Sequence, residues 1–365
     1  MLQRRLSPGC LPVVFILLSV SLFLNLALLL PPVPSEVASP SPLPHHLGGD
    51  PRRVGNIRGH VAVPQLKPSR AFPPPPPPTG QPPQRKTRTR EEAEQLYDLM
   101  LHKKGTWDGS PIVVPEHKLL LLTVPKNACE EFKRLARRMY GFEDWRQTWD
   151  TKGPGRKYEL PHDPRKNGLK YLGNFDRSAA VDMLASPDWT LAAFFRDPHE
   201  RFLSAYLDKH VDTRAVREGE KEALAFPDFI NAVGAGLKNR HWLAQCAYVT
   251  KQGCGGAKNM AECDGCRIVV ESLDFAGRFG ALGEDTEALL RMLPGDAWAR
   301  YGETGWGAGS IFQVAPDKKH ATGSEKKWDK YFGGEEGQRA FDKVKQLFAV
   351  DFANLPGKTF QHTQS

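Results

Sequence analysis

The chain has 365 residues, of which 40% are hydrophobic and 25% charged, and its net charge is +8. This length suits one large or two modest domains, and 10% aromatic residues without a glycine period exclude full disorder and collagen. Residues 1–30 contribute +2 and residues 31–90 contribute +7, which leaves −1 for residues 91–365. A nucleic-acid-binding domain would itself carry the positive charge, so this distribution argues against a nucleic-acid partner.

The N-terminus has the composition of a membrane anchor. Residues 10–30 form an uncharged run, CLPVVFILLSVSLFLNLALLL, whose length as a helix is about 31 Å, close to the hydrocarbon thickness of a bilayer. Arg4 and Arg5 precede it, so the positive-inside rule predicts a cytosolic tail at residues 1–9 and a single-pass type II membrane protein. A cleaved signal peptide is the alternative, and both interpretations place the folded part in the secretory pathway.

Residues 31–90 are predicted to be an extended stem. They hold 17 of the 31 prolines, including the run 73–78, and few large apolar residues. Such a segment cannot bury enough surface to offset its chain entropy. Its last residues, RKTRTR at 85–90, are expected to be a solvated run of charge, with a processing site or an anionic-glycan contact as alternatives. An anchor, a stem and a lumenal domain at residues 91–365 are together typical of a Golgi protein.

A strand followed by a tight turn and a helix is predicted around residue 120. Residues 117–124 (HKLLLLTV) form a short apolar run typical of a buried parallel strand, and the segment CEEFKRLARRMYG after the turn has one apolar helical face. Lys126 lies in the turn, PKNA, where the positive end of the helix suits phosphate or sulfate. An ordinary connection with an exposed lysine is the alternative. The chain contains no GxxxxGK[ST], so this is not a Walker loop.

A second junction of this kind follows about 70 residues later. Residues 189–195 (WTLAAFF) are another apolar strand, and the next segment, RDPHERFLSAYLDK, has the Asp-Pro and Glu of a capped helix start. Arg196 leaves the end of the strand, and Ser204 lies on the new helix. An arginine with a hydroxyl suits a phosphate dianion, so two anion-binding junctions are predicted in sequence.

These segments resemble the donor-binding motifs of sulfotransferases. VPKNACEEFKRL (124–135) is similar to their 5′-phosphosulfate loop, and FRDPHERFLSAYLDK (195–209) is similar to their 3′-phosphate motif. The order of several further motifs resembles that of the Golgi carbohydrate sulfotransferases of the chondroitin/dermatan type. Those motifs are His241-Trp242, Cys263-x-x-Cys266, Asp274-Phe275, Glu284-Asp285 and Asp351-Phe352. The resemblance extends over roughly residues 117–355.

The resemblance implies a P-loop-like α/β sulfotransferase fold, with a central parallel sheet flanked by helices, in addition to the transmembrane helix. It implies 3′-phosphoadenosine-5′-phosphosulfate (PAPS) as donor, a glycan hydroxyl as acceptor, in-line sulfuryl transfer and no metal. Lys126 would stabilise the charge that develops on the leaving oxygen, and Arg196 and Ser204 would hold the 3′-phosphate. The residues expected to bind the 5′-phosphosulfate are Pro125, Lys126, Asn127, Ala128, Cys129 and Phe132.

Glu130 and Glu131 depart from the family pattern, in which hydroxyl residues usually follow the loop cysteine. A carboxylate that faced a phosphosulfate would repel it. Either both side chains point outward and the donor binds, or the protein is a weak or inactive sulfotransferase that binds glycans in the Golgi.

Two histidines are candidates for the general base that takes the proton of the acceptor hydroxyl. His162, in YELPHDP with Glu159 beside it, is the first candidate, and it completes the predicted catalytic set with Lys126. His241 is the second candidate, although its neighbour Trp242 suggests a structural or sugar-stacking role instead.

The cysteines suggest an oxidising compartment. Cys10 lies in the apolar run and Cys129 in the loop, and the remaining four lie within 21 residues: Cys246, Cys254, Cys263 and Cys266. These four allow three pairings, and two disulfides are expected, with a zinc site of poor ligand spacing as the alternative.

Other classes of function share parts of this layout. Metal-dependent Golgi glycosyltransferases usually carry Asp-x-Asp, and the chain has no two aspartates separated by one residue. A glycan-binding module would not need the Arg-Asp-Pro junction. A sulfotransferase that acts on a protein tyrosine or a lipid would share the donor motifs. The sequence does not indicate the oligomeric state.

Overall fold

The computed structural model describes residues 85–101, 110–147, 160–213, 216, 219–250, 264–304 and 322–356. The predicted membrane anchor at residues 10–30 and the stem as far as residue 84 lie outside these ranges. Among the described helices, none is both long enough and apolar enough to cross a bilayer.

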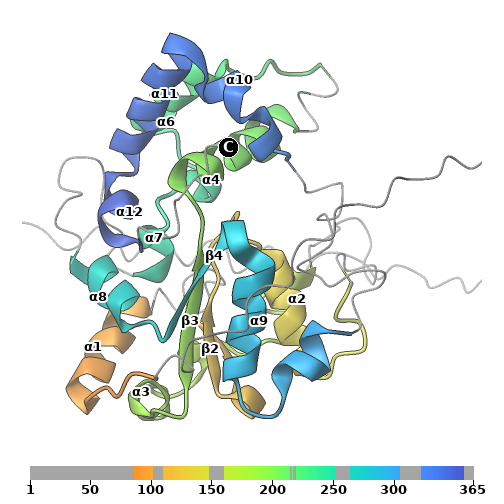
Figure 1. The fold of residues 1–365 in the computed structure, drawn as a ribbon, viewed down its shortest axis with the longest axis vertical. Helices are drawn as coiled ribbons and strands as arrows, with labels where there is room; N and C mark the ends of the chain where they lie inside the picture. The colour runs from red at the N-terminus through yellow and green to blue at the C-terminus, as the bar shows by residue number, and fades with distance from the viewer. Residues whose placement is uncertain are drawn as a thin grey trace, which may run out of the picture. The chain divides into compact units, whose positions relative to one another are not determined.

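A four-stranded sheet forms the centre of the described domain (Figure 1). The strands lie in the order β1 (Ile112–Val114), β2 (Leu119–Leu122), β3 (Thr190–Phe195) and β4 (Phe275–Arg278). β2, β3 and β4 are parallel, and β1 is antiparallel to β2. The two apolar runs chosen from the sequence are therefore neighbouring parallel strands, and the prediction of a parallel sheet is confirmed for three of the four strands.

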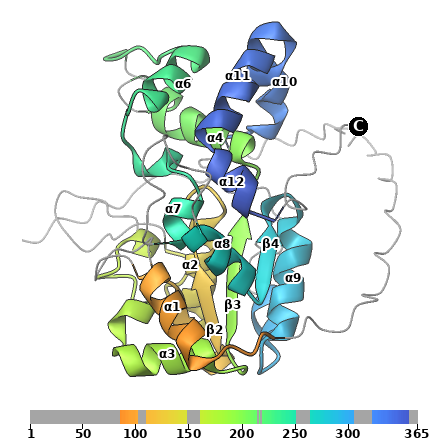
Figure 2. The ribbon, with the colours of Figure 1, turned by 90° about the vertical axis from the view of Figure 1, so that its left-hand side faces the viewer.

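Helices cover both faces of the sheet, as predicted (Figure 2). Side chains alternate along β2, so that Leu120 and Leu122 enter one core and Leu119 and Leu121 the other. The first core is closed by α1 (Arg90–Met100), α3 (Arg177–Ala185) and α8 (Asp264–Ser272). The second is closed by α2 (Cys129–Met139) and α9 (Leu282–Met292).

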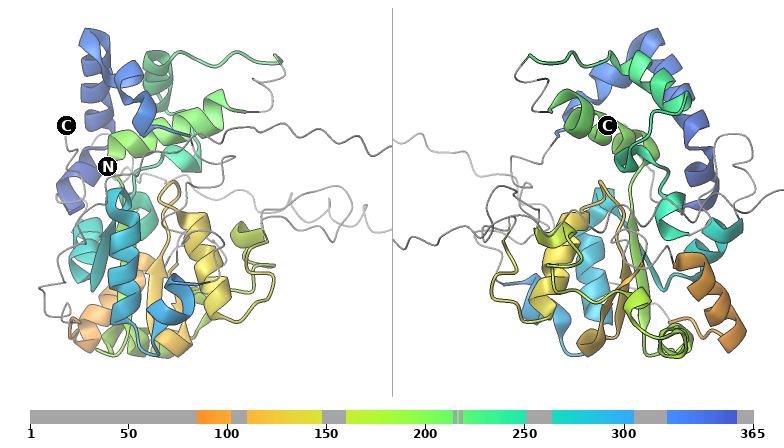
Figure 3. Two further views of the ribbon diagram at one scale, coloured as in Figure 1. Left: turned by 45° about the vertical axis from the view of Figure 1, so that its right-hand side comes forward. Right: turned by 180° about the vertical axis from the view of Figure 1, so that it is seen from behind.

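A separate layer of helices lies beyond the carboxyl ends of the parallel strands (Figures 1 and 3). Its own apolar core includes Phe202, Phe229 and Val344. The layer consists of α4 (Pro198–Tyr206), α6 (Phe226–Gly234), α10 (Trp328–Phe332) and α11 (Gly334–Leu347). Two short helices, α7 (Cys246–Val249) and α12 (Ala349–Asn354), lie between this layer and α8 (Figure 2). The remaining turns are η1 (Pro115–His117), η2 (Leu160–His162), η3 (Leu172–Asn174), η4 (Leu207–Val211), η5 (Arg240–Trp242), η7 (Phe279–Ala281), η8 (Trp298–Gly302) and η9 (Glu325–Lys327).

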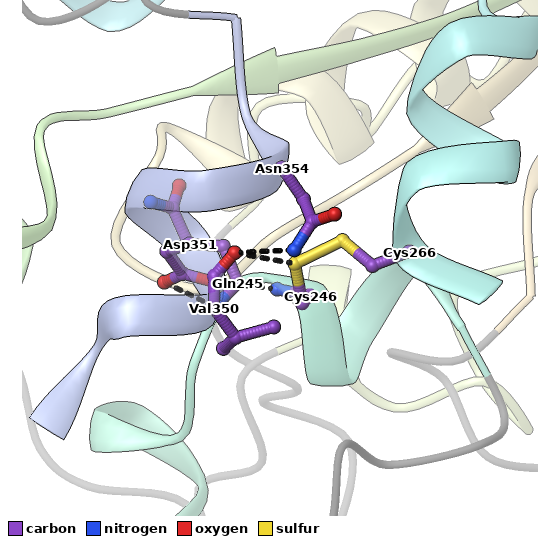
Figure 4. Close-up of a disulfide and its surroundings, with 6 residues drawn as sticks. All are labelled: Gln245, Cys246, Cys266, Val350, Asp351 and Asn354. Carbon is purple, nitrogen blue, oxygen red and sulfur yellow. Dashed lines mark hydrogen bonds between the residues drawn. A yellow bond between two sulfur atoms is a disulfide. The ribbon is translucent and has the colours of Figure 1, made fainter. Parts of the chain in front are cut away.

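A disulfide between Cys246 and Cys266 joins α7 to α8 (Figure 4). Next to it, the buried carboxylate of Asp351 accepts the backbone N–H groups of Gln245 and Cys246 at 2.8 and 2.9 Å. One of the expected disulfides is thus present and its pairing is assigned. Cys254 and Cys263 lie outside the described residues.

The basic run at residues 85–90 is solvated only in part, since most of its residues are exposed but Arg88 is not. Arg88 is buried and pairs with the buried carboxylate of Asp274 at 2.9 Å. The side chains of Arg85, Lys86 and Arg88 also donate to carbonyl groups at the ends of three helices: Leu184 in α3, Glu271 and Ser272 in α8, and Met292 in α9. Cations are favourable at these carbonyls, since the carboxyl end of a helix is its negative end. Residues 85–90 therefore make packed contacts with the described domain.

Replacing Arg88 with Ala should destabilise the fold, because it leaves the Asp274 carboxylate buried without its counter-charge. We expect a loss of about 3–5 kcal/mol of unfolding free energy, measured by urea denaturation of the full chain. Arg90→Ala is the matched control, since its ion pair with Asp182 is exposed and should contribute no more than about 1 kcal/mol. Equal effects of the two substitutions would contradict a structural role for the basic run.

Candidate functional site

The turn between β2 and α2 has an unusual backbone. Lys126 and Ala128 both lie in the left-handed region, with φ of 71° and 58°, a conformation that costs a residue with a side chain about 1–3 kcal/mol. Ala128 is the N-cap of α2 and offers no side chain to the first amides of the helix. These amides and the positive helix end therefore remain suited to an anion.

Two side chains hold this turn against β3 and α4. Asn127 donates from its amide to the backbone oxygen of Phe194 at 2.9 Å and to Oε1 of Gln245 at 2.7 Å. The fully buried Arg201 donates from Nε to the oxygen of Pro125 at 3.0 Å. Sequence analysis did not assign Arg201, although it lies in the Arg-Asp-Pro segment. Arg201 thus supports the turn from its buried side.

The second predicted junction lies directly beside the first. Arg196, at the end of β3, donates from Nη1 to the backbone oxygen of Lys126 at 3.2 Å, and its guanidinium lies 4.1 Å from the ring centre of Phe279. Asp197 caps α4 by accepting the amides of His199 and Glu200. Two residues 70 positions apart in the sequence are thus in contact.

Two further hydroxyl groups join this second junction. Nη2 of Arg196 donates to Oγ of Ser324 at 2.8 Å, and Oγ1 of Thr322 donates to Oγ of the buried Ser204 at 3.2 Å. Sequence analysis missed Thr322 and Ser324. The local signal is slight, a Thr-Gly-Ser in a lysine-rich segment, and such residues are common on any polar surface.

The side chains of Glu130 and Glu131 extend along α2 toward its carboxyl end. Both reach Arg134, one turn further on, at 2.5 Å for Glu130 and 2.8 Å for Glu131. One guanidinium thus pairs with both carboxylates, and the contacts turn them along the helix. The negative charge of both glutamates is thus compensated by Arg134 within α2.

A carboxylate and two ammonium groups surround the turn. Nζ of Lys126 lies 2.9 Å from Oδ2 of Asp208, and Nζ of Lys209 lies 3.1 Å from the same oxygen. Burial lowers the pKa of Lys126, and Asp208 offsets part of this effect. Burial alone would raise the pKa of Asp208, but the two lysines hold it below its usual value. Asp208 and Lys209 were not among the predicted site residues, and both lie on the π-helical turn η4, a type of turn often found at functional sites.

The two candidate bases lie near the same charges. Burial, and then the charge of Lys133, lowers the pKa of His162 to about 2. Burial, and then the charges of Lys209 and Lys126, lowers the pKa of His241 to about 4. Lys209 also lowers the pKa of His162, so both rings belong to one electrostatic site. Glu159 lies outside the described residues.

The turn thus brings together Lys126, Arg196 and the first amides of α2, and the two histidines of lowered pKa belong to the same electrostatic environment. Within the described ranges, no group of three or more His, Cys, Asp or Glu side chains could hold a metal ion. The profile of the sulfotransferase family matches residues 111–293, half of the chain, and this range holds both junctions. The chain belongs to the sulfotransferase family.

One curated relative of the chain is a carbohydrate sulfotransferase. The chain is 28% identical over 193 residues to carbohydrate sulfotransferase 9 of Homo sapiens. The alignment covers 50% of this chain and 40% of that protein, so the chain spans less than half of its relative's length. No solved structure matches the chain significantly.

The residues predicted to bind the donor differ in their surroundings in the structure. Pro125, Lys126 and Ala128 form the turn, and Cys129 is the first, half-buried residue of α2. The amides of two predicted residues are used within the protein, because Asn127 donates to Val124 and Phe132 donates to Ala128. The Phe132 ring packs in the core, 4.3 Å from the ring of Phe194, and Trp242 is likewise a buried core residue. A sugar-stacking role for Trp242 therefore has no exposed ring to support it.

Removing the charge of Lys209 should raise the pKa of both histidines, since each ring would then take up a proton with less repulsion. We expect an upward shift for His241 in Lys209→Ala, measured residue by residue from the pH dependence of histidine Cε1–H exchange by mass spectrometry. Lys343→Ala is the control, because that lysine bonds to Asn231 on the α6–α11 surface. An unchanged pKa of His241 in Lys209→Ala would show that this charge does not act on the site.

Proposed function

We propose that this protein transfers a sulfuryl group from PAPS to a glycan hydroxyl. The contact between Arg196 and the Lys126 carbonyl is the main support, because it brings an uncapped helix end, a lysine and an arginine to one place. Such a pair of cationic junctions suits a donor that carries anionic groups at both ends. The relative's description as a carbohydrate sulfotransferase supports a glycan acceptor.

The residues of the turn fit the 5′-phosphosulfate of the donor. Lys126 and the first amides of α2 would bind it, and Lys126 would exchange its ion pair with Asp208 for one with the donor. PAPS supplies a sulfuryl group on a good leaving group. The protein's part is then to position the donor and to stabilise the negative charge on the leaving oxygen, for which Lys126 is placed.

The second junction fits the 3′-phosphate. Arg196 and Ser204 would bind it, with the hydroxyls of Thr322 and Ser324 within reach of the same groups. Arg196 already has several acceptors, so its guanidinium is pre-oriented before a ligand arrives. Pre-orientation lowers the entropy that is lost on binding.

An inactive glycan-binding protein is the competing function, and it depends on repulsion of the donor by Glu130 and Glu131. Their pairing with Arg134 favours the enzyme. We also propose that residues 10–30 anchor the protein in the Golgi membrane with the folded domain in the lumen. The Cys246–Cys266 disulfide supports an oxidising compartment.

Binding of 3′-phosphoadenosine-5′-phosphate (PAP), the desulfated donor, tests the donor site directly. We expect Lys126→Ala and Arg196→Ala each to weaken PAP binding by about 10- to 100-fold in isothermal titration, since each removes a charge-assisted contact of about 1.5–3 kcal/mol. Lys343→Ala should bind PAP like the wild type. A folded wild-type protein that does not bind PAP would refute the donor site.

Transfer of label from [35S]PAPS to chondroitin, to a neutral oligosaccharide, to a tyrosine peptide and to a lipid separates the acceptor classes. Label on a glycan supports the proposal. Label on the peptide or the lipid alone would assign a non-glycan sulfotransferase.

Replacing Arg134 with Met should also weaken PAP binding, by several-fold, because Glu130 and Glu131 would lose their counter-charge beside the anion site. Adding Glu130→Gln and Glu131→Gln to the Arg134→Met variant should restore the affinity, again measured by titration with PAP. If the triple variant binds PAP as weakly as the single variant, the two glutamates are not the cause.

A further inference from the structure

His241 is held in one tautomer by Asn239. The backbone N–H of His241 donates to Oδ1 of Asn239 at 2.9 Å, and ring Nδ1 lies 2.8 Å from the same oxygen. A backbone N–H can only donate, so the Asn239 atom that faces both nitrogens is its oxygen. Nδ1 of His241 therefore carries the ring proton, and Nε2 keeps its lone pair.

His162 has the opposite arrangement. Its Nδ1 lies 3.3 Å from Nζ of Lys133, a lysine that is fully buried in α2. An ammonium group has only donors, so Nδ1 of His162 must be the acceptor. The single proton of the neutral ring is then on Nε2, and the lone pair that a base would use is already engaged.

We propose that Nε2 of His241 takes the proton of the acceptor hydroxyl in the sulfotransfer reaction. Asn239 is the positioning residue that keeps this nitrogen unprotonated. Because Nδ1 of His162 accepts a hydrogen bond from Lys133, its Nε2 carries the proton and can only donate, so His162 does not act as the base. This assignment rests on the proposed function and gives His162 and His241 different roles in it.

The step balances as a single displacement. The acceptor oxygen forms a bond to sulfur while the bond between sulfur and the phosphate oxygen breaks, and that oxygen leaves with the electron pair. The hydroxyl proton moves to Nε2 of His241 and gives an imidazolium, which returns the proton to water after the product leaves.

The charges around His241 fit this role. The groups that act on it are Lys209, Lys126, Asp208 and Arg240. Burial and the cations hold the pKa of His241 at about 4, so the ring is neutral at physiological pH and able to accept a proton. The negative charge of a bound donor would offset the cations and raise this pKa toward the range in which a base is effective.

Asp208 is a less suitable base. Its carboxylate is paired with two ammonium groups, at 2.9 and 3.1 Å, which hold its pKa below the usual value. A base must gain affinity for a proton in the transition state, and these contacts reduce that affinity. The lone pair of His241 Nε2 has no such partner among the described residues.

Glutamine substitutions separate the two roles, because an amide can donate a hydrogen bond but cannot accept a proton. We expect His241→Gln to lower kcat by 10²- to 10⁴-fold with little change in PAP affinity, measured with [35S]PAPS and chondroitin. His162→Gln should keep kcat within about tenfold of the wild type. Equal losses, or a larger loss in His162→Gln, would overturn the assignment.

The pH profile gives a readout that a structural defect would not move. The kcat of the wild type should fall as the pH drops through the pKa of His241 in the donor complex, because an imidazolium cannot accept the proton. Asn239→Ala should lower kcat more than it changes KM and should displace this acidic limb. Asn231→Ala, on the surface of α6, is the matched control.

Histidine exchange tests the Lys133 contact without any acceptor. Lys133→Met should raise the pKa of His162, and Lys133→Arg, which keeps a donor, should not. An unchanged pKa in Lys133→Met, with the protein folded, would overturn the proposed tautomer of His162. Failure of the proposed function would instead appear as a folded wild-type protein that neither binds PAP nor transfers sulfate.

Discussion

The parallel pairing of β2 with β3 is the constraint on which the site depends. Because Leu122 pairs with Ala193, the carboxyl ends of β2 and β3 lie next to each other, and each strand continues into a turn and a helix. Two helix N-termini thus lie side by side, although the segments are about 70 residues apart. Asn127, Arg196 and Arg201 then tie one turn to the other through backbone oxygens. These bonds to backbone oxygens fix the position of the β2–α2 turn relative to β3 and α4.

The electrostatics of the site follow from this geometry. Positive groups that converge on one turn repel one another, and the structure compensates them with carboxylates that a ligand can replace or that lie to the side. Asp208 pairs with Lys126 and Lys209, whereas Glu130 and Glu131 are held by Arg134 along the helix. This explains how a folded domain with a net charge near zero can contain a strongly cationic site.

The parts of the fold that could be predicted from the sequence are those with local signals. The apolar runs of β2 and β3, the turn with Lys126, and the capped start of α4 each depend on neighbouring residues. The contacts that complete the site join distant segments, as between Arg196 and Ser324, and no local pattern marks them. The packed contacts of the basic run at residues 85–90 could not be predicted for the same reason, since their acceptors are carbonyl groups more than 90 residues away. The sequence could name His162 and His241 as candidates, but only their contacts with Lys133 and Asn239 distinguish them.

The low pKa of His241 links its basicity to donor binding in the proposed reaction. A ring with a pKa of about 4 is neutral but a poor base. Its basicity rises only when negative charge enters beside Lys126 and Lys209, and the donor is what brings that charge. In the proposed reaction, the cations that would bind the donor therefore also couple donor binding to the basicity of His241.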